Sequence, residues 1–338
     1  MKPPAGKSAG ACSATRAVRG GWPGRLHGRW VGLISASVRM KTKILLGLMF
    51  ALLAAISAGA AAADGFSQEN AAWRAKRIAE LTAPDGWLAL VGWHVLKPGE
   101  NTVGHAPGND VLLPQGPARL GVATLAADGK VTLQVAAGVG ATIDGQVARS
   151  GELRVGGGAV KPTLVACGTV SFFVIERGGK RALRVKDSAS ERRARFAGVD
   201  YFPPDPAWRI EARWVAFEKS RIIPLTTILG QTSPALVPGK AVFERDGKTY
   251  ELLAIDEGPG EPLLCVIADA TTGQETYGGA RFVYAEAPKD GVVVLDFNRA
   301  ENPPCAFTPF ATCPLPPKEN RLPFAVTAGE KNYRGSHD

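Results

Sequence analysis

Apolar and polar residues alternate, or fall in short apolar runs, along most of the chain after residue 87. Both patterns are typical of β-strands. Turn-forming pairs such as Asp128-Gly129 and Asp246-Gly247 separate the runs, and both residue types tolerate the positive φ angles of tight hairpins. The pattern predicts a mainly β, mostly antiparallel protein. The expected strands are Leu88–Val91, Gly121–Leu125, Val131–Val135, Val170–Ile175, Ala182–Val185, Arg209–Ala216, Ala241–Glu244, Tyr250–Ile255, Leu263–Ala268, Arg281–Ala285 and Val292–Phe297.

One clear helix is predicted before the first strand. Ser67 is the expected N-cap, Glu69 places an acid in the first turn, and Pro84-Asp85-Gly86 ends the segment. A short helical turn is also expected at Ser188–Phe196, between two sheets. The first helix should bury one apolar face against the rest of the protein, and that face would consist of Ala71, Ala75, Ile78 and Leu81.

The length of the chain predicts two β units behind a leader at residues 1–63. About 275 of the 338 residues follow the leader, which is long for one sandwich. We expect residues 64–177 to hold the helix and a β sandwich. Residues 178–338 should hold a second, barrel-like β unit with a Pro-rich C-terminal tail. The boundary is expected where a charged hairpin meets Pro203-Pro204-Asp205-Pro206.

The leader has the three parts of a secretory signal. Met40-Lys41-Thr42-Lys43 supplies a basic start, Ile44–Ile56 an apolar run, and the small residues after it a cleavage site near Ala63. Residues 40–63 therefore predict a signal peptide and a periplasmic or secreted mature protein. A retained membrane anchor is the open alternative, because the run is about long enough if its alanines are counted. We expect translation to begin at Met40, so that residues 1–39 precede the true start site. The alternative is that they form an unusually long basic region of the signal peptide.

The net charge of +9 comes entirely from the leader. Nine of the 40 Lys and Arg residues precede Asp64 and no acidic residue does, so 31 basic and 31 acidic residues follow. A neutral mature protein has no electrostatic footprint for a phosphate backbone. The distribution excludes nucleic acid as the partner, and membrane contact is expected only through an uncleaved signal segment.

Four cysteines follow the leader. Cys305 and Cys313 are eight residues apart in a Pro-rich segment, and an exported protein meets an oxidising compartment, so we predict a disulfide between them. Cys167 and Cys265 lie in apolar runs and are expected to be buried, although a bridge between them remains open. The few histidines make a metal site improbable, and we predict neither a metal nor a cofactor.

The polar residues near the C-terminus offer the best case for catalysis. Asp296 and Asn298 alternate with apolar residues, so in a strand they would share one face. If the tail folds across the barrel mouth, Asp296 and Glu319 could form a carboxylate pair with Arg281 as counter-charge. The competing interpretation, which we favour, is that Asp296 and Asn298 cap the backbone of the tail while Glu319 and Arg321 pair on the surface.

A few polar residues of the same region are candidates for ligand binding. Tyr277 opens a Gly-containing loop before Arg281, where the backbone could approach a ligand closely, although a simple turn is the commoner explanation. The tail offers three further polar side chains. The predicted binding residues are Tyr277, Asn298, Asn320 and Arg321.

Two segments of the N-terminal unit form a recognisable pattern. They are Asn101-Thr102-Val103-Gly104-His105 with Asn109-Asp110-Val111-Leu112-Leu113-Pro114, and Ala141–Gln146. The first resembles the opening of a forkhead-associated domain, and the second resembles its closing hairpin. The resemblance implies a β sandwich. It departs at the phosphate site, because His105 stands where those domains carry an arginine, and Gly116–Val122 supplies no Ser/His pair. We therefore expect no phosphothreonine peptide as partner.

A longer set of motifs covers most of the mature chain, and the most specific of them lie near the C-terminus. They are Leu295-Asp296-Phe297-Asn298, Asn302–Pro309, Cys313-Pro314, Pro317–Pro323 and Ala328-Gly329-Glu330-Lys331, preceded by Gly92-Trp93, Gly99-Glu100-Asn101, Glu176–Gly179, Arg184–Asp187 and Phe202-Pro203. With these motifs the chain resembles the exported bacterial family catalogued as domain of unknown function 1684. The resemblance implies export and a β-rich fold but no reaction.

Two hypotheses for function follow. The first is a non-catalytic exported module that binds an unknown small molecule or an envelope protein. It is favoured because no nucleophile elbow, Walker loop, Rossmann fingerprint or zinc motif occurs. The second is a periplasmic hydrolase acting through Asp296, Glu319 and Arg281, which requires these three side chains to converge in a concave site.

Overall fold

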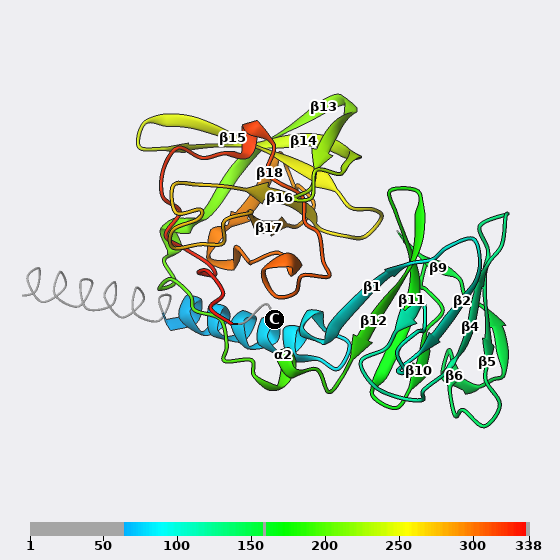
Figure 1. Ribbon diagram of the computed structural model, residues 1–338. Coiled ribbons are helices and arrows are strands. Elements are labelled where there is room, and N and C mark those ends of the chain that lie inside the picture. The colour runs from blue at the N-terminus through cyan, green and yellow to red at the C-terminus, as the bar shows by residue number, and fades with distance from the viewer. Residues whose placement is uncertain (1–63, 158–159, 336–338) are drawn as a thin grey trace, which may run out of the picture. The chain divides into compact units, whose positions relative to one another are not determined.

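The computed structural model describes residues 64–157 and 160–335, and the predicted leader lies outside them. The protein is mainly β, as predicted, with three sheets in two β units (Figure 1). Short helical segments join or follow the strands. These are η1 (Trp87–Ala89), α2 (Glu191–Ala194), η2 (Pro206–Trp208), η3 (Phe297–Arg299), η4 (Pro304–Ala306) and η5 (Lys318–Asn320).

The N-terminal helix covers residues 64–82 of the described chain. It is already helical three residues before Ser67, so Ser67 as N-cap was wrong. The predicted end is confirmed: a Cβ on Gly86 would lie 2.4 Å from the Glu80 carbonyl oxygen, so the chain turns where only glycine fits. The predicted apolar face was wrong in part, because Ala71 and Ala75 are exposed. The buried residues of the helix are Asn70, Arg77 and Leu81.

The N-terminal β unit is a sandwich of two sheets around one apolar core. One sheet has the order β1-β12-β11-β10-β6-β7, with β9 paired to β11, and the other has the order β3-β2-β4-β5-β8. The strands of the sandwich are β1 (Leu90–Val95), β2 (Gly99–Gly104), β3 (Val111–Leu112), β4 (Gly121–Leu125), β5 (Val131–Val135), β6 (Thr142–Ile143), β7 (Gln146–Val147), β8 (Ser150–Glu152), β9 (Val155–Gly156), β10 (Val165–Cys167), β11 (Val170–Arg177) and β12 (Lys180–Asp187).

The sandwich follows the alternation of the sequence closely. In β5, the buried residues Val131, Leu133 and Val135 alternate with exposed ones. The predicted first strand is displaced, because residues 87–89 form η1 and β1 begins at Leu90. The sheet also continues beyond the expected boundary at residue 177, since β12 pairs along its length with β11 and β1.

The C-terminal β unit contains one six-stranded antiparallel sheet, ordered β17-β16-β15-β14-β13-β18. Its two outermost strands, β17 and β18, also contact each other, so the sheet curls into the barrel-like form that the sequence predicted. Two apolar clusters fill it. The strands are β13 (Arg209–Thr226), β14 (Thr232–Arg245), β15 (Lys248–Asp256), β16 (Leu263–Ile267), β17 (Arg281–Ala285) and β18 (Val292–Asp296).

The turn chemistry is as expected at three hairpins. Asp144, Asp246 and Asp290 have φ angles of 49°, 53° and 51°, and each is followed by a glycine that also has a positive φ. These are the angles that Asp and Gly adopt more readily than other residues. The helical turn expected within Ser188–Phe196 is also present, as α2, with Ser190 as its N-cap.

The C-terminal tail has little regular structure, and backbone hydrogen bonds hold it in place. The Glu330 N–H donates to the Ala300 carbonyl at 2.8 Å, and the Phe202 N–H donates to the Gly329 carbonyl at 3.0 Å. Gly329 has a φ of 80°, and a Cβ there would lie 2.5 Å from the Ala300 carbonyl oxygen. Only glycine fits this close approach, which fixes the position of Glu330.

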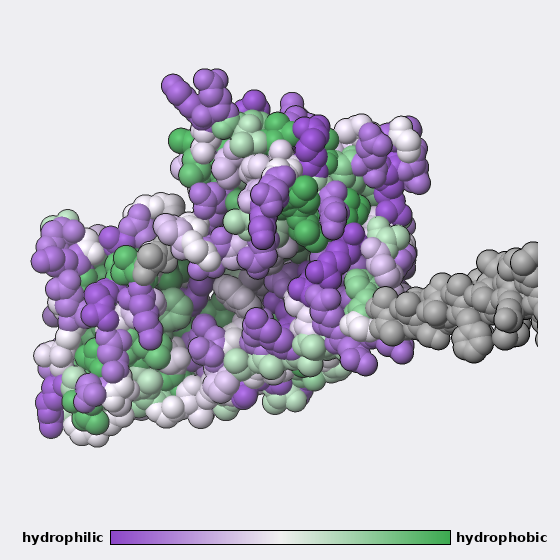
Figure 2. Space-filling view, turned by 180° about the vertical axis from the view of Figure 1, so that it is seen from behind, coloured by the Kyte–Doolittle hydropathy of each residue, from purple (hydrophilic) through white to green (hydrophobic). Residues whose placement is uncertain are grey.

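No helix within residues 64–157 and 160–335 is long and apolar enough to cross a membrane. On the face shown in Figure 2, hydrophilic residues dominate, and apolar residues form separate patches between them. Isolated apolar surface residues are normal for a folded protein. This face therefore presents no extended apolar docking area.

Candidate functional site

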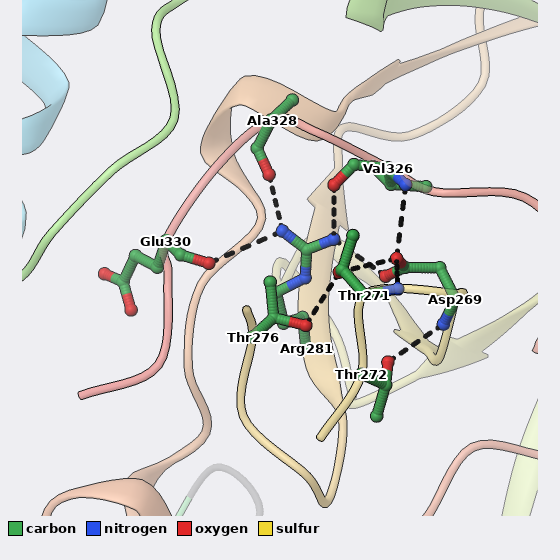
Figure 3. Close-up of polar contacts among 8 residues, drawn as sticks. All are labelled: Asp269, Thr271, Thr272, Thr276, Arg281, Val326, Ala328 and Glu330. Atoms are coloured by element: carbon green, nitrogen blue, oxygen red, sulfur yellow. Dashed lines mark hydrogen bonds and ion pairs between the residues drawn. The ribbon is translucent and has the colours of Figure 1, made fainter. Parts of the chain in front are cut away.

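Arg281, the predicted counter-charge, lies at the start of β17 with its guanidinium enclosed by the C-terminal β unit (Figure 3). Its side chain is 1% exposed. Nη2 donates to Asp269 Oδ2 at 2.8 Å and to the Val326 carbonyl at 2.9 Å. Nη1 donates to the carbonyl oxygens of Ala328 and Glu330. Both Nη groups thus donate to acceptors inside the protein, whereas the buried Nε has no hydrogen-bond partner.

Asp269 completes this buried ion pair. Its Oδ1 accepts hydrogen bonds from the Thr271 N–H at 2.8 Å, the Thr271 hydroxyl at 2.6 Å and the Val326 N–H at 3.2 Å. Burial alone would raise the pKa of Asp269, but Arg281 and the bonds from Thr271 outweigh it, so the pKa is lowered. The pair ties the loop at residues 268–276 to the tail, a role that the sequence pattern did not predict for Asp269.

A second buried network joins the N-terminal helix to the tail. Arg77 Nε donates to Glu330 Oε1 at 3.0 Å, and Arg77 Nη1 lies 3.1 Å from Glu301 Oε1. Glu330 Oε2 accepts from the Asn302 N–H at 2.6 Å. Burial raises the pKa of Glu301 to about 7, although Arg77 opposes the rise. The network is structural, because most of its hydrogen-bond donors and acceptors bond to one another.

The residues of the second network were not predicted. Glu330 falls in the family-like block Ala328-Gly329-Glu330-Lys331, which was the available signal. Arg77 could have been found from helical spacing, since Asn70, Arg74 and Arg77 recur every three or four residues on the face that the protein covers. An apolar pattern was sought on that helix, and its buried face is largely polar.

Asp296 and Asn298 do cap the backbone, as the favoured interpretation held. Asp296 is the N-cap of η3, where its Oδ1 accepts from the Asn298 N–H at 3.1 Å and from the Asn298 side-chain amide at 3.0 Å. Asn298 is fully buried and exchanges two hydrogen bonds of 2.9 Å with the backbone of Asp205. Arg299 lies 3.4 Å from Asp296 Oδ2.

The remaining tail residues lie in and beside η5. Asn320 is fully buried and pairs with the backbone of Leu253, accepting at 2.7 Å and donating at 2.9 Å. Glu319 is half-buried, and Arg321 is exposed where it bridges to Ala268. Asn298 and Asn320, both predicted to bind a ligand, thus use their amides to join segments of the chain.

The three proposed catalytic residues do not meet. Among the described residues no hydrogen bond or ion pair links Asp296, Glu319 and Arg281 to one another. The helix η3, which Asp296 caps, contacts β13 and β17, whereas η5 contacts β15 and β16. The structure therefore gives each residue a separate place and, for two of them, a separate set of partners.

Cys305 and Cys313 lie next to each other and are free thiols in this structure, so the predicted disulfide is not present in it. The Cys305 N–H donates to Cys313 Sγ at 3.1 Å, and the Tyr277 hydroxyl lies 3.6 Å from Cys305 Sγ. The hydrogen bond from Cys313 lowers the pKa of Cys305, and the pKa of Cys313 is raised. Tyr277, a predicted binding residue, therefore contacts this thiol pair. Cys265 is fully buried, as expected, and Cys167 is half-buried.

Cations without carboxylate partners gather on the outer face of the sandwich sheet. Arg177 in β11, Arg184 in β12 and Arg192 in α2 form no ion pair within the described chain, and the Lys186 ammonium donates to the Asp85 carbonyl. Arg184 lies over Trp87 at 5.5 Å, and Arg192 lies over Phe310 at 5.4 Å. Burial, with repulsion from Arg177, lowers the pKa of Arg184 to about 10.

Several cavities open on the described surface. One of about 530 Å³ lies at one end of the sandwich and is lined by Leu96, Pro98, Leu125 and Arg181 among others. A cavity of about 360 Å³ is lined by Arg77, Trp87 and Lys186. A smaller cavity, of about 80 Å³, is lined by Trp93, Arg177, Leu229, Gln231, Pro309, Phe310 and Thr312.

The described residues contain no group of three or more His, Cys, Asp or Glu side chains placed to hold a metal ion. His105, in the part that resembles a forkhead-associated domain, has its Nδ1 3.1 Å from the Leu113 carbonyl oxygen. The predicted closing hairpin of that part is present as β6 and β7. In this sandwich the His105 side chain therefore contacts a backbone carbonyl of the same unit.

Comparison with known proteins identifies the C-terminal β unit. Residues 194–331 match the family described as "Protein of unknown function (DUF1684)". The solution NMR structure of the uncharacterized protein from gene locus rrnAC0354 of Haloarcula marismortui is 36% identical over 41% of this chain and 78% of that chain, with a TM-score of 0.36. The chain belongs to the DUF1684 family. No curated protein matches it.

The DUF1684 region contains both halves of the Arg281–Asp269 pair, together with Glu301 and Glu330. It also contains the thiol pair. Arg77, Arg177 and Arg184 lie before the matched residues. The carboxylates of Glu301 and Glu330 in the DUF1684 region therefore pair with an arginine of the N-terminal helix. The tail also packs beside arginines of the sandwich.

Proposed function

We propose that this DUF1684 protein is an exported binding module and that the C-terminal block of polar residues is structural. One observation carries the choice: Asp296 caps η3, Arg281 is paired with Asp269, and within the described residues no hydrogen bond or ion pair joins either of them to Glu319. A general acid or base must reach the proton it transfers in a substrate complex. Side chains committed to the backbone and to buried ion pairs are poorly placed for that role.

The cavities support binding. The cavity of about 530 Å³ at the end of the sandwich has the size of a small-molecule site. Its lining is mostly apolar, with Arg181 and Glu176 paired beside it. Such a lining suits recognition of a small molecule or of a segment of an envelope protein.

Native mass spectrometry of the mature protein, purified without denaturation, tests the proposal. We expect a retained small-molecule mass on the wild type and the same mass on Asp296→Asn. The hydrolase hypothesis would be supported instead by a bare protein that cleaves ester or glycoside substrates and loses this activity in Asp296→Asn. That outcome would overturn the proposal.

The proposal includes export and cleavage near Ala63. The sequence of the leader supports it, since residues 40–63 have the basic, apolar and small-residue parts of a signal. N-terminal sequencing of the protein recovered from a periplasmic fraction should begin at Ala63 or Asp64. Recovery of the uncleaved chain from the membrane fraction would favour the anchor.

The proposal also keeps the disulfide between Cys305 and Cys313. Their adjacency supports it, because the backbone N–H of one cysteine already contacts the sulfur of the other. Alkylation of the exported protein under denaturing conditions should leave these two thiols unmodified until a reductant is added. Cys265→Ser should not change the result, whereas labelling of Cys305 without reduction would contradict it.

We propose, finally, that the sandwich is related to forkhead-associated domains without sharing their phosphothreonine recognition. His105 stands in place of the phosphate-binding arginine and faces the Leu113 carbonyl oxygen. Titration with a phosphothreonine peptide and its unphosphorylated form should give no difference in affinity. Selective binding of the phosphopeptide would refute this part.

A further inference from the structure

The strand register places two arginines on one surface of the sandwich. Phe173 pairs with Arg184 between β11 and β12, and Phe172 pairs with Val185. Phe172 and Val185 belong to the core. Because strand residues alternate between faces, Arg184 and Arg177 both lie on the opposite, outer face.

This outer surface is partly covered, so its charges are not fully solvated. Thr308 donates to the Leu90 carbonyl at 3.0 Å, and the following residues Pro309, Phe310 and Thr312 line a small cavity with Trp93 and Arg177. Trp93 is the register partner of Arg184 between β1 and β12. Arg177 therefore lines the cavity, while Arg184 pairs with the lining residue Trp93 and is close enough to Arg177 for that charge to lower its pKa.

The same place holds hydrogen-bond donors that lack partners. Trp93 Nε1, Arg184 Nε and Thr312 Oγ1 are buried and have no hydrogen-bond partner. An indole N–H and a guanidinium Nε–H can only donate. A buried donor without an acceptor costs roughly 1–3 kcal/mol, so the site favours a ligand that brings acceptors.

No charge of the described chain neutralises these arginines. Within the described residues neither Arg177 nor Arg184 is within ion-pair distance of a carboxylate, and the charge of Arg177 lowers the pKa of Arg184. Both arginines lie near the Cys313 sulfur, which would be negative if it lost its proton. The raised pKa of Cys313 keeps that thiol protonated at neutral pH.

We propose that Arg177, Arg184, Trp93 and Thr312 form a binding site for an oxyanion, a carboxylate or phosphate group carried by a small-molecule ligand. Guanidinium groups recognise both oxyanions through paired N–H donors, and the indole and hydroxyl donors complete the set. The cavity of about 80 Å³ exceeds the share of liquid volume of two water molecules, so it admits the anionic group while the rest of the ligand remains outside.

The inference rests on the proposed binding function and specifies the ligand by its charge. Binding of the anion also relieves the repulsion between two partly desolvated cations, so the occupied site should stabilise the fold. It assigns the recognition role to β1, β11 and β12, where residues 88–187 precede the DUF1684 match. The tail supplies the cover.

The test is titration of the dialysed full-length mature protein with inorganic phosphate and, separately, with acetate, followed by isothermal calorimetry and by the melting temperature. We expect saturable binding of at least one of the two anions, which also identifies the preferred chemistry. Arg184→Gln should weaken that binding at least tenfold, and Trp93→Phe, which removes the indole N–H together with part of the ring, should weaken it less.

Arg154→Gln is the matched control, because Arg154 is an exposed arginine of the sandwich already paired with Asp144. It should bind like the wild type. Unchanged binding in both Arg184→Gln and Trp93→Phe, or no binding of either anion by the wild type, would overturn the site. If native mass spectra show the same retained small molecule on the wild type and on Arg184→Gln, the protein is a binding module but this site is not where the molecule binds. A bare protein that binds neither anion would count against both.

Discussion

At the residue scale, the most informative side chains are the buried charges. Arg281 and Asp269 have side chains that are 1% and 0% exposed, and hydrogen bonds satisfy the remaining oxygens of the carboxylate. A buried ion pair is often no more stabilising than an apolar pair of the same size. Removing one member is different, because the other charge remains in a medium that cannot solvate it.

Asp269→Ala should therefore be strongly destabilising. It leaves Arg281 buried without a counter-charge and also removes acceptors from Thr271 and Val326. We expect a loss of about 3–5 kcal/mol in the free energy of unfolding, measured by urea titration. Glu152→Ala, an exposed acid in β8, should change it by less than about 0.5 kcal/mol. Equal effects of both changes would contradict the structural role of the pair.

At the element scale, the sequence predicted strands well wherever local alternation and turn residues agreed. It missed the length of β13 and β14, which continue as a hairpin beyond Ala216 and begin before Ala241. That extension contains the register pair Pro224 and Pro234 and follows a bulge after Ala216. Prolines are unfavourable within strands, so the sequence did not predict strands here. The two segments are extended because they pair with each other.

The path of the tail could not be predicted from the sequence either, because it depends on contacts between residues far apart in the chain. Gly329→Ala tests one of these contacts, the close approach of Gly329 to Ala300. The substitution forces a side chain onto a backbone with a φ of 80° and places its Cβ 2.5 Å from the Ala300 oxygen. We expect a loss of about 1–3 kcal/mol in the free energy of unfolding, measured by thermal or chemical denaturation.

Gly140→Ala is the control for this substitution. A Cβ at Gly140 would meet no atom within 4 Å, and its φ lies outside the left-handed region. Its unfolding free energy should be unchanged or slightly increased, since alanine restricts the unfolded chain. A Gly329→Ala protein as stable as Gly140→Ala would show that the tail relaxes around the added methyl group.

At the scale of the whole molecule, the candidate site could be predicted only in part. The resemblance identified the block with Asp296, Asn298 and Glu330, but residue spacing could not show that Asp296 is a cap or that Glu330 pairs with Arg77. The outer-face arginines Arg177 and Arg184 entered the sequence analysis only as part of the family resemblance and received no role, because charged strand residues are usually solvated. Only the three-dimensional structure shows that the tail covers them.

The network around Arg77 gives the stability of the molecule a pH dependence. Glu301 has its pKa raised from 4.5 to about 7, so the folded state holds this proton more tightly than the unfolded state. Its stabilising contribution is complete below pH 4.5 and is lost as the pH rises through 7. Between pH 5 and 8 the wild type should therefore lose about 1–3 kcal/mol of unfolding free energy relative to Glu301→Gln, which does not titrate at this position. A pH-independent difference in urea titrations would contradict the raised pKa.

Arg77 and Glu330, which meet across 253 positions of sequence, also constrain the order of folding. The ribosome makes the helix first, and its guanidinium has no carboxylate to enter until nearly all of the described chain has been synthesised. Docking of the helix is therefore a late event, and a chain interrupted before residue 330 keeps an unmatched charge at a surface meant to be buried. We therefore expect such a truncated product to be cleaved by proteases within the helix more readily than the whole chain.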